Sequence, residues 1–552
     1  MESIYEKNQT VEGVSTDLTP SESSQNAVVI EQPNARFGHE GLKRKLSSRH
    51  VQMIAIGSNI GTGLFIGTGS ALKRGGPAAV VIAFSCISIA LYLMMASLTE
   101  LAVHYPVSGS FVSYASRFVD PALGFAVGWQ YWGCWIAVFA VEATAFAIII
   151  DYWNHPMPTA AAITIFLGIT CFINFMPVRA FGEAEFYTSS IKVISVIMFI
   201  IVALVLIGGG GPTGQKYDGS YWVDPGAFAQ GFHGMAAVFV TAAFACGGIE
   251  IVGVIAGESA SPRHNIPRAA KTVWIRIFIF YVITCILISI LVPYTDPNLL
   301  GGTDVNASPF IVAIKRASIR ALPDVLNAII LICVCSVGTS SLYASSRMLL
   351  YMSTVGMAPR IFGKTDRQGR PITALILTTL VGVGLSYLNV SKTGAQVFGW
   401  FSSLSGTGFF IFWLTIFLCN FRWRAAQKAQ GVDMLHEEQY TYRQWGYPFA
   451  PAIGFLLVAF MLICNGYTSI WPLSGSPNAT NFFANYLGVP VFIFMWAGWK
   501  LWHRTWWFCI PSTQVDLSID RRRLRDHPDE KEFLDEYTAL PRWKKVMSYI
   551  TF

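Results

Sequence analysis

The pattern of hydrophobic and polar positions divides the chain into about twelve apolar runs, separated mostly by short polar segments. An apolar run of roughly 20 residues is long enough for an α-helix to cross the hydrocarbon core of a bilayer. The pattern therefore predicts an all-α polytopic membrane protein with about 12 transmembrane helices. The predicted spans lie near residues 50–72, 77–104, 122–153, 157–176, 184–208, 231–256, 273–293, 325–351, 372–389, 396–419, 449–471 and 485–503.

The first run contains an unusual concentration of glycine, with five glycines between Ile54 and Gly69. Gly61-Thr62-Gly63 in mid-span leaves backbone amides and carbonyls exposed, which is tolerated at membrane depth only where the backbone lines a cavity. A half-helix that begins there directs its positive end at an anionic group such as a carboxylate. The segment is therefore predicted to be a broken helix at a binding site. Close packing of helices through small residues is the alternative interpretation.

A second interruption supports the first interpretation. The sixth run, near residues 231–256, contains Ala245-Cys-Gly-Gly-Ile-Glu250, in which a carboxylate closely follows Gly247 and Gly248. Transporters built from inverted repeats carry paired helix breaks in corresponding halves. The two interruptions therefore predict a secondary transporter with its site between them.

Composition agrees with a membrane protein and narrows its chemistry. Hydrophobic residues make up 53% of the chain and charged residues only 13%, about half the charged fraction of a soluble globule. Most of the ten cysteines fall inside apolar runs, so neither a disulfide framework nor a metal site is expected, and no cofactor is predicted. The net charge of +7 fits cytoplasmic loops better than nucleic-acid binding, because no basic cluster is interleaved with aromatic residues.

The distribution of lysine and arginine predicts the orientation. Most of these residues fall on one side of the membrane if both termini are cytoplasmic, as the positive-inside rule requires. The prediction is a disordered cytoplasmic N-tail, a transmembrane domain with two repeats and two extra helices, and a charged, solvated cytoplasmic C-tail. Their respective ranges are 1–46, 47–507 (repeats about 50–208 and 231–419, extra helices about 449–503) and 508–552.

Several polar positions suggest partners at the membrane surface. Lys7, Lys43 and Lys45 are exposed tail lysines that ubiquitin ligase machinery could modify. The basic run Arg521–Arg525 is interpreted mainly as part of the solvated tail, with contact to anionic lipid head groups as the alternative. The sequons at Asn306 and Asn478 both fall outside the cell in this topology, and their glycosylation is left open.

A series of motifs in order along the chain resembles the fungal amino-acid permeases of the amino acid, polyamine and organocation superfamily. The resemblance runs from about Arg44 to Trp507. It is carried by Ile60-Gly-Thr-Gly-Leu-Phe65, Gly75-Gly-Pro77, Pro106-Val-Ser-Gly-Ser-Phe111, Phe181-Gly-Glu-Ala-Glu-Phe186 and Leu342-Tyr-Ala-Ser-Ser-Arg347. It implies the leucine-transporter type of fold, with two inverted repeats of five helices and two additional helices. It also implies proton-driven import of L-amino acids across the plasma membrane.

The resemblance assigns expected roles to residues at the two breaks. Thr62 and Gly63 are expected to donate to the substrate carboxylate, and Gly61 to allow close approach. Carbonyls around Asn59–Ile60 and Phe244–Ala245 are expected to receive the ammonium group, and Phe244 to lie beside the substrate, although ordinary packing explains a phenylalanine equally well. The side-chain pocket is expected to include Thr339 and Ser403, the latter in a softened stretch, Ser402–Gly408.

Three ionisable residues inside predicted spans are candidates for proton coupling. A charged side chain at mid-membrane costs about 2.5 to 3.5 kcal/mol on insertion scales, so each needs a reason. Glu250 lies beside the second break, and Glu142 matches a glutamate found in many family members. Lys192 corresponds to a lysine that replaces a sodium ion in proton-coupled relatives. Buried structural ion pairs are the alternative for all three.

The remaining alternatives concern function and substrate. An amino-acid sensor of the same fold with little transport is the main rival, and a channel is a weaker one. An intramembrane enzyme would need a Gly-x-Gly-Asp arrangement or a His-Glu-x-x-His helix, and neither occurs. Ser58, Asn59 and Thr339 depart from the family pattern, which puts the substrate range in doubt. A neutral or broad range is expected.

Overall fold

The computed structural model describes residues 53–54, 57–153, 157–259, 261–299, 308–390, 394–437, 439–473, 475–541, 543 and 545. Within these residues the structure contains helices and no strand, so the all-α prediction is confirmed. The predicted N-tail with Lys7, Lys43 and Lys45 lies outside the described residues, as does Asn306.

The helices follow the predicted spans. Eight helical stretches in the described part of the chain are long and apolar enough to cross a membrane. They are α3 (Pro77–His104), α5 (Pro121–Ile150), α7 (Val178–Ile207), α8 with α9 (Gly231–Cys246 and Ile251–Ile255), α10 with α11 (Pro262–Ile277 and Thr284–Leu291), α13 (Leu322–Thr354), α15 (Gly394–Gln430) and α17 (Phe449–Ile470).

Four further segments complete the predicted set. Two are shorter apolar helices, and a third is a pair of helices bent by 72° at its break. The fourth is the first predicted span, which is itself broken. These segments are α6 (Thr159–Asn174), α14 (Ile372–Ser386), α18 with α19 (Ala479–Tyr486 and Gly488–His503), and η1 with α2 (Gly63–Gly67 and Thr68–Gly75).

Both predicted helix breaks are present. The first span is helical at Gly57, turns at residues 58–61 and resumes as the π-helix η1. The second span ends α8 at Cys246, turns through residues 247–250 and resumes as α9. At Gly248 the backbone has φ +95°, a conformation that glycine adopts without strain. These breaks lie in the first and the sixth of the predicted spans.

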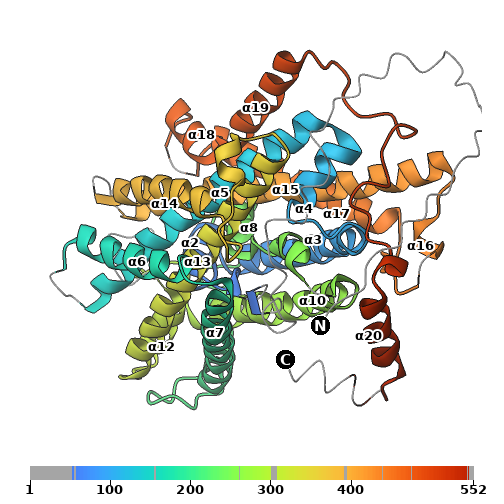
Figure 1. Cartoon of the computed structure of the whole chain (residues 1–552). Helices are drawn as coiled ribbons and strands as arrows, with labels where there is room; N and C mark the ends of the chain where they lie inside the picture. The colour runs from blue at the N-terminus through green and yellow to red at the C-terminus, as the bar shows by residue number, and fades with distance from the viewer. Residues whose placement is uncertain are drawn as a thin grey trace, which may run out of the picture.

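The broken helices lie at the centre of the molecule. Figure 1 shows α2, α5, α8 and α13 close together, with α6, α7 and α14 toward the periphery. The α8–α9 stretch is the most deeply buried of the long apolar spans, whereas only a minority of the residues of α7 and α17 are buried. Exposed apolar surface is expected where lipid is the solvent.

The tenth span differs from its prediction. The expected softened stretch Ser402–Gly408 is wrong, because α15 is continuous through it. The Thr407 hydroxyl donates to the Ser403 carbonyl within the helix, at 2.8 Å. A Cβ at Gly406 would lie 2.5 Å from the Val240 carbonyl oxygen, so this glycine permits close packing against α8 rather than a break.

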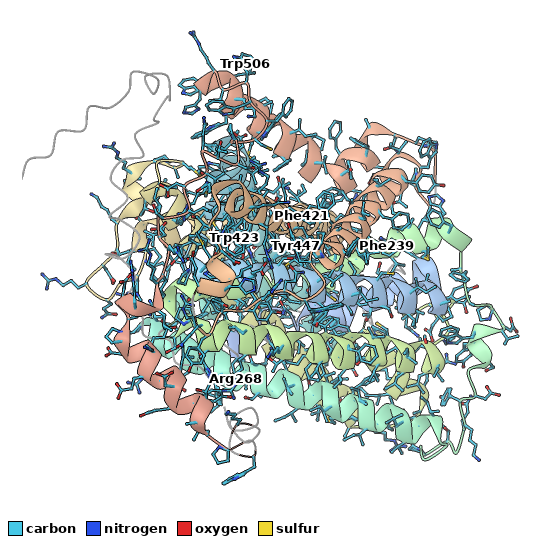
Figure 2. The ribbon with its side chains drawn as sticks, turned by 90° about the vertical axis from the view of Figure 1, so that its right-hand side faces the viewer. Phe239, Arg268, Phe421, Trp423, Tyr447 and Trp506 are labelled. Atoms are coloured by element: carbon cyan, nitrogen blue, oxygen red, sulfur yellow. The ribbon has the colours of Figure 1, made fainter. Side chains whose placement is uncertain are left out.

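The C-terminal segment also differs from its prediction. A solvated tail is wrong for the described residues, because this segment packs back onto the helical bundle and forms η9 (Leu524–Asp526) and α20 (Pro528–Ala539). Leu517, Leu524 and Leu534 are buried. In Figure 2, Trp506 lies at the end of α19, and the chain then returns toward the face that carries Arg268. Apolar burial and buried polar contacts together hold the segment in place.

Candidate functional site

A small cavity lies between the two helix breaks. It encloses about 10 Å³, which is room for about one water molecule. Residues from both breaks and from α5 and α15 line it: Ser58, Asn59, Gly61, Gly63, Trp135, Val138, Glu142, Phe244, Gly247 and Phe409. The structure therefore brings Asn59, Gly61, Gly63, Glu142, Phe244 and Gly247 together, as the sequence predicted. It also shows a closed form of this region.

The two broken helices touch through their smallest residues. A Cβ at Gly63 would lie 2.3 Å from Ala245 Cα, which is closer than any side chain could approach without displacing backbone. A Cβ at Gly61 would lie 2.7 Å from the Val337 side chain of α13. Position 63 therefore requires glycine if the second broken helix is to lie this close to the first. The same contact shows that the predicted site residue Ala245 lies against the first broken helix.

The second break is packed against aromatic rings. A Cβ at Gly247 would lie 2.2 Å from the Phe409 ring, and one at Gly248 would lie 2.9 Å from the Trp135 ring and 3.0 Å from Asn59 Oδ1. Ser58 Oγ donates to the Gly248 carbonyl across the cavity, at 3.4 Å. The exposed backbone of one break is thus in direct contact with polar side chains of the other.

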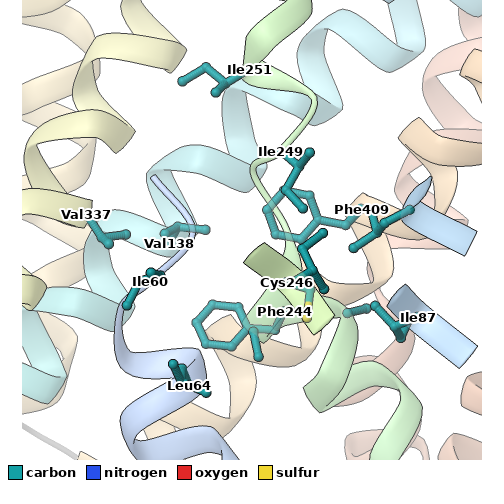
Figure 3. Close-up of a cluster of buried hydrophobic side chains, with 14 of the residues drawn as sticks. Ile60, Leu64, Ile87, Val138, Phe244, Cys246, Ile249, Ile251, Val337 and Phe409 are labelled. Atoms are coloured by element: carbon teal, nitrogen blue, oxygen red, sulfur yellow. The ribbon is translucent and has the colours of Figure 1, made fainter. Parts of the chain in front are cut away.

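Three aromatic side chains from three elements close the cavity. Trp135, Phe244 and Phe409 are all buried. The rings of Trp135 and Phe409 meet edge to face, with centroids 6.1 Å apart. Figure 3 shows Ile60, Val138 and Val337 on one side of this region and Phe409 on the other. The predicted site residue Ile60 therefore belongs to the apolar packing around the cavity. An aromatic and aliphatic lining with few polar groups is typical of small-molecule sites.

Glu142 is linked directly to the first break. The Thr62 hydroxyl donates to Glu142 Oε1 at 2.7 Å, while Glu142 Oε2 is buried without a hydrogen-bond partner among the described residues. Thr62 is fully buried and does not line the cavity. In this conformation its hydroxyl is held by Glu142, so the expectation that it donates to the substrate is not supported by the geometry.

Lys192 contacts the first broken helix. Its ammonium donates to the Gly57 carbonyl, the last helical residue before the break. Glu185 lies beside Lys192, with 4.0 Å between Glu185 Oε1 and Lys192 Nζ. The Ser336 hydroxyl donates to the same Glu185 oxygen at 2.8 Å. Both charged side chains are buried. This contact joins three elements, namely the first span, α7 and α13.

Glu185 is a candidate that sequence reasoning missed. It belongs to the motif Phe181–Phe186 and lies seven residues before Lys192 on the same helix. Seven residues are close to two helical turns, so the two side chains share a face. That spacing of opposite charges inside one apolar span is the signal that could have identified the pair.

Glu250 follows the second break but does not line the cavity. Its Oε2 accepts a hydrogen bond of 3.4 Å from Trp413 Nε1, while Oε1 is buried without a partner among the described residues. The Tyr131 hydroxyl is also buried without a partner there. Unpaired buried polar atoms are costly and call for an explanation, such as a functional role. In the described part of the chain no three His, Cys, Asp or Glu side chains gather as a metal site would require.

Two predicted pocket residues lie elsewhere. The Thr339 hydroxyl donates to the Cys335 carbonyl, and Thr339 lines a separate cavity of about 310 Å³ between α5, α6, α7 and α13. The Ser403 hydroxyl donates to Asn485 of α18 at 3.2 Å. Neither residue reaches the cavity between the breaks, because each points from the far face of its helix. Their assignment to the substrate pocket is not supported by this geometry.

Comparisons with known proteins agree with this architecture. A sequence profile of the family described as "Amino acid permease" matches residues 50–508. The chain is 43% identical over 518 residues to the general amino-acid permease GAP2 of Candida albicans, covering 92% of this chain and 86% of the relative. It is 38% identical over 552 residues to the general amino-acid permease GAP1 of Saccharomyces cerevisiae, covering 98% and 90%. It is 40% identical over 562 residues to the cationic amino acid transporter 1 of Schizosaccharomyces pombe, covering 99% and 93%.

Proposed function

Because this chain belongs to the amino-acid permease family, we propose that it imports L-amino acids together with protons across the plasma membrane. Amino-acid transport follows from the family itself, and the chain is a transporter rather than an enzyme. Proton coupling, a broad substrate range and alternating access of one site to the two sides of the membrane are the parts that we add. Alternating access requires that the site close around its cargo after it opens to one side of the membrane and before it opens to the other.

The observation that carries the proposal is the closed cavity between the two helix breaks. Backbone N–H groups are free of helix partners where a half-helix begins, and they suit a carboxylate. Backbone carbonyls where a half-helix ends suit an ammonium group. Ser58, Asn59 and Gly61 of the first break and Gly247 of the second line one cavity, so both half-helix ends meet there. That arrangement matches the two charged groups shared by all L-amino acids.

The cavity must widen before an amino acid enters. Its volume of about 10 Å³ holds about one water, whereas even a small amino acid needs several times that space. Phe244 and Phe409 come from different elements, so a movement of the second broken helix relative to α15 separates them. Opening toward one side and then the other is the alternating-access cycle that we propose.

Proton coupling is proposed at carboxyl groups attached to the breaks. Glu142 holds the first break through Thr62, and Glu250 follows the second break against Trp413. A change in protonation at either carboxyl changes what it can accept from these donors, and this links a proton to the position of each broken helix. Lys192 contacts the first broken helix through the Gly57 carbonyl.

A broad substrate range fits the lining. Among the described residues, no lysine or arginine lines the cavity to pair with an acidic side chain, and Glu142 is the one carboxylate there. Two of the relatives described above are named general permeases, and one is named a cationic amino acid transporter. Neutral amino acids together with some larger cationic ones are therefore the proposed cargo.

Orientation and regulation complete the proposal. The excess of lysine and arginine on one side supports cytoplasmic termini. Lys7, Lys43 and Lys45 are proposed acceptors for ubiquitin ligase machinery, because the sequence predicts that they belong to a polar cytoplasmic tail. Replacement of these three lysines by arginine should lengthen residence at the cell surface, which surface labelling over time would measure.

The test is uptake of a panel of labelled amino acids into cells that lack their own permeases. Uptake is measured at acidic and neutral external pH, with and without a protonophore. Saturable uptake that is strongest in acid and is lost with the protonophore supports the proposal, and the panel defines the range. Surface protein that binds amino acids but moves none would instead identify a sensor. Uptake that is insensitive to the protonophore would remove proton coupling.

A further inference from the structure

The basic run in the C-terminal segment has two distinct faces. Arg522 and Leu524 are buried, Arg521 and Arg523 are partly buried, and Arg525 is exposed. Residues 521–523 precede η9 (Leu524–Asp526), to which Arg525 belongs. One face of the run therefore anchors the segment, and the guanidinium groups of Arg521, Arg523 and Arg525 line one pocket.

The anchoring face is held by several contacts. Arg522 Nε donates to Glu530 Oε2 of α20 at 2.8 Å, in a pair with little exposure to solvent. The Arg522 backbone N–H donates to the His104 carbonyl at the end of α3, at 2.9 Å. The Arg522 carbonyl in turn accepts from Arg263 Nη2 of α10, at 2.8 Å. The segment is thus fixed to the ends of α3 and α10, so the outward guanidinium groups start from a defined backbone.

The outward face forms one wall of a pocket. The pocket encloses about 560 Å³, within the usual range for small-molecule sites. Its other walls come from the segment around α16 (Met434–Glu437) and from α20, which lie near each other in Figure 1. The charged residues that line it are Arg521, Arg523, Arg525, Lys531 and Glu437. Four cations against one carboxylate leave a net charge of +3.

Local pairing leaves most of this charge available. Arg521 reaches Glu437 at 3.5 Å, and Arg525 reaches Asp526 at 3.6 Å, with both side chains of the second pair largely exposed. The Arg525–Asp526 pair is exposed, and exposed ion pairs contribute little and are readily replaced. Arg523 and Lys531 make no ion pair with any described residue. The pocket is therefore concave, positively charged and weakly compensated.

We propose that this pocket binds a polyphosphorylated anion of the inositol phosphate class, either as a soluble molecule or as the head group of a phosphoinositide. Guanidinium groups bind phosphate oxygens in pairs, and three of them with one ammonium suit several phosphates around one ring. A single phosphate would engage only part of the lining. The bound anion would connect the basic run with α20 and the segment around α16, and it would hold the C-terminal segment against the bundle.

The test uses the purified full-length protein in detergent at about 150 mM salt, where distant surface charges are largely screened. Inositol hexakisphosphate is titrated, and binding is measured by calorimetry and by the rise in unfolding temperature that a ligand of the folded state produces. The pocket variant is Arg523→Gln with Lys531→Gln. The control is Lys364→Gln with Lys428→Gln, two exposed lysines outside the pocket whose replacement removes the same charge.

The pocket variant is expected to bind at least about tenfold more weakly, because it loses two charge-assisted contacts, while the control retains its affinity. An equal loss of affinity in both variants would overturn the proposal. So would the absence of saturable binding both to the soluble anion and to vesicles that contain a phosphoinositide. A second arm replaces the soluble anion with vesicles containing a phosphoinositide. Binding to vesicles alone, lost in the pocket variant, identifies the lipid head group as the source. Both readouts are independent of transport, so they remain valid if the proposed uptake fails.

Discussion

Gly63 shows how one residue can set the distance between two helices. Its Cα faces the backbone of Ala245, and no other residue type fits that space without displacing one of the broken helices. The sequence placed this glycine at the binding site for a different reason, namely access of the substrate carboxylate to the backbone. The structure adds a packing reason, and both depend on the absence of a side chain.

Replacement of Gly63 by alanine is therefore expected to reduce uptake more than tenfold at normal surface abundance. The new Cβ would lie 2.3 Å from Ala245 Cα and push the two breaks apart. Uptake of labelled amino acid normalised to surface protein is the measurement. Gly168→Ala is the control, because a Cβ there meets nothing within 4 Å. Unchanged uptake in Gly63→Ala would show that the contact is not needed for transport.

Glu142 and Glu250 yield a prediction about external acidity. Glu142→Gln keeps an amide oxygen that can accept from Thr62, and Glu250→Gln keeps one for Trp413, but neither amide can exchange a proton. Each variant is expected to lose part of the rise in uptake between neutral and acidic medium. The measurement is the ratio of uptake at the two pH values, at matched surface level. A variant with the full ratio takes its carboxyl out of the coupling path, even if its uptake is lower overall.

At the scale of elements, the sequence predicted what local composition determines. Clustered glycines identified both helix breaks, and apolar length identified the spans. The sequence could not predict which side of a helix points toward the cavity, because this depends on packing against distant segments. Val337 contacts the first break, and Thr339 lies two residues later, about 200° around the helix. Ser403 precedes Phe409 by six residues, a net rotation of about 240°, and so faces α18 instead of the cavity.

The same limit explains the Glu185–Lys192 pair. Their spacing places both on one face of α7, but only the fold shows that this face meets Gly57 and Ser336. Lys192→Met is expected to abolish most uptake, since the Gly57 carbonyl loses its donor at the start of the break. Glu185→Gln should have a smaller effect, because Ser336 can still donate to the amide oxygen. Uptake and surface labelling of both variants test which loss is larger. A larger loss of uptake in Glu185→Gln would contradict the assignment of Lys192 as the residue that holds the first broken helix.

At the scale of the whole molecule, the C-terminal segment is part of the fold. Its charged composition suggested a solvated tail, because sequence alone could not reveal that Arg522 pairs with Glu530 eight residues later. Composition counts charges without showing which ones neutralise each other. Buried charge requires such a partner, and removing one member of a buried pair typically costs about 3 to 5 kcal/mol.

Glu530→Ala is accordingly expected to release the segment from the bundle. Arg522 would remain buried without its carboxylate, and undocking would return it to water. The measurement is limited proteolysis of the purified protein, in which cleavage between residues 510 and 541 should accelerate at least tenfold. Glu532→Ala removes an equivalent but exposed charge from α20 and should leave the rate unchanged. Equal protection of both variants would show that the pair does not hold the segment.

The size of the central cavity has a consequence for how affinity is measured. In the closed form the cavity has room for about one water molecule, so an amino acid can only meet a form that has already opened. Half-saturation of uptake then combines the intrinsic affinity of the open form with the fraction of molecules that adopt it. A substitution remote from the breaks that favours opening would make the permease look tighter toward every cargo by the same factor. Selectivity between two amino acids would remain unchanged, because both require the same opening.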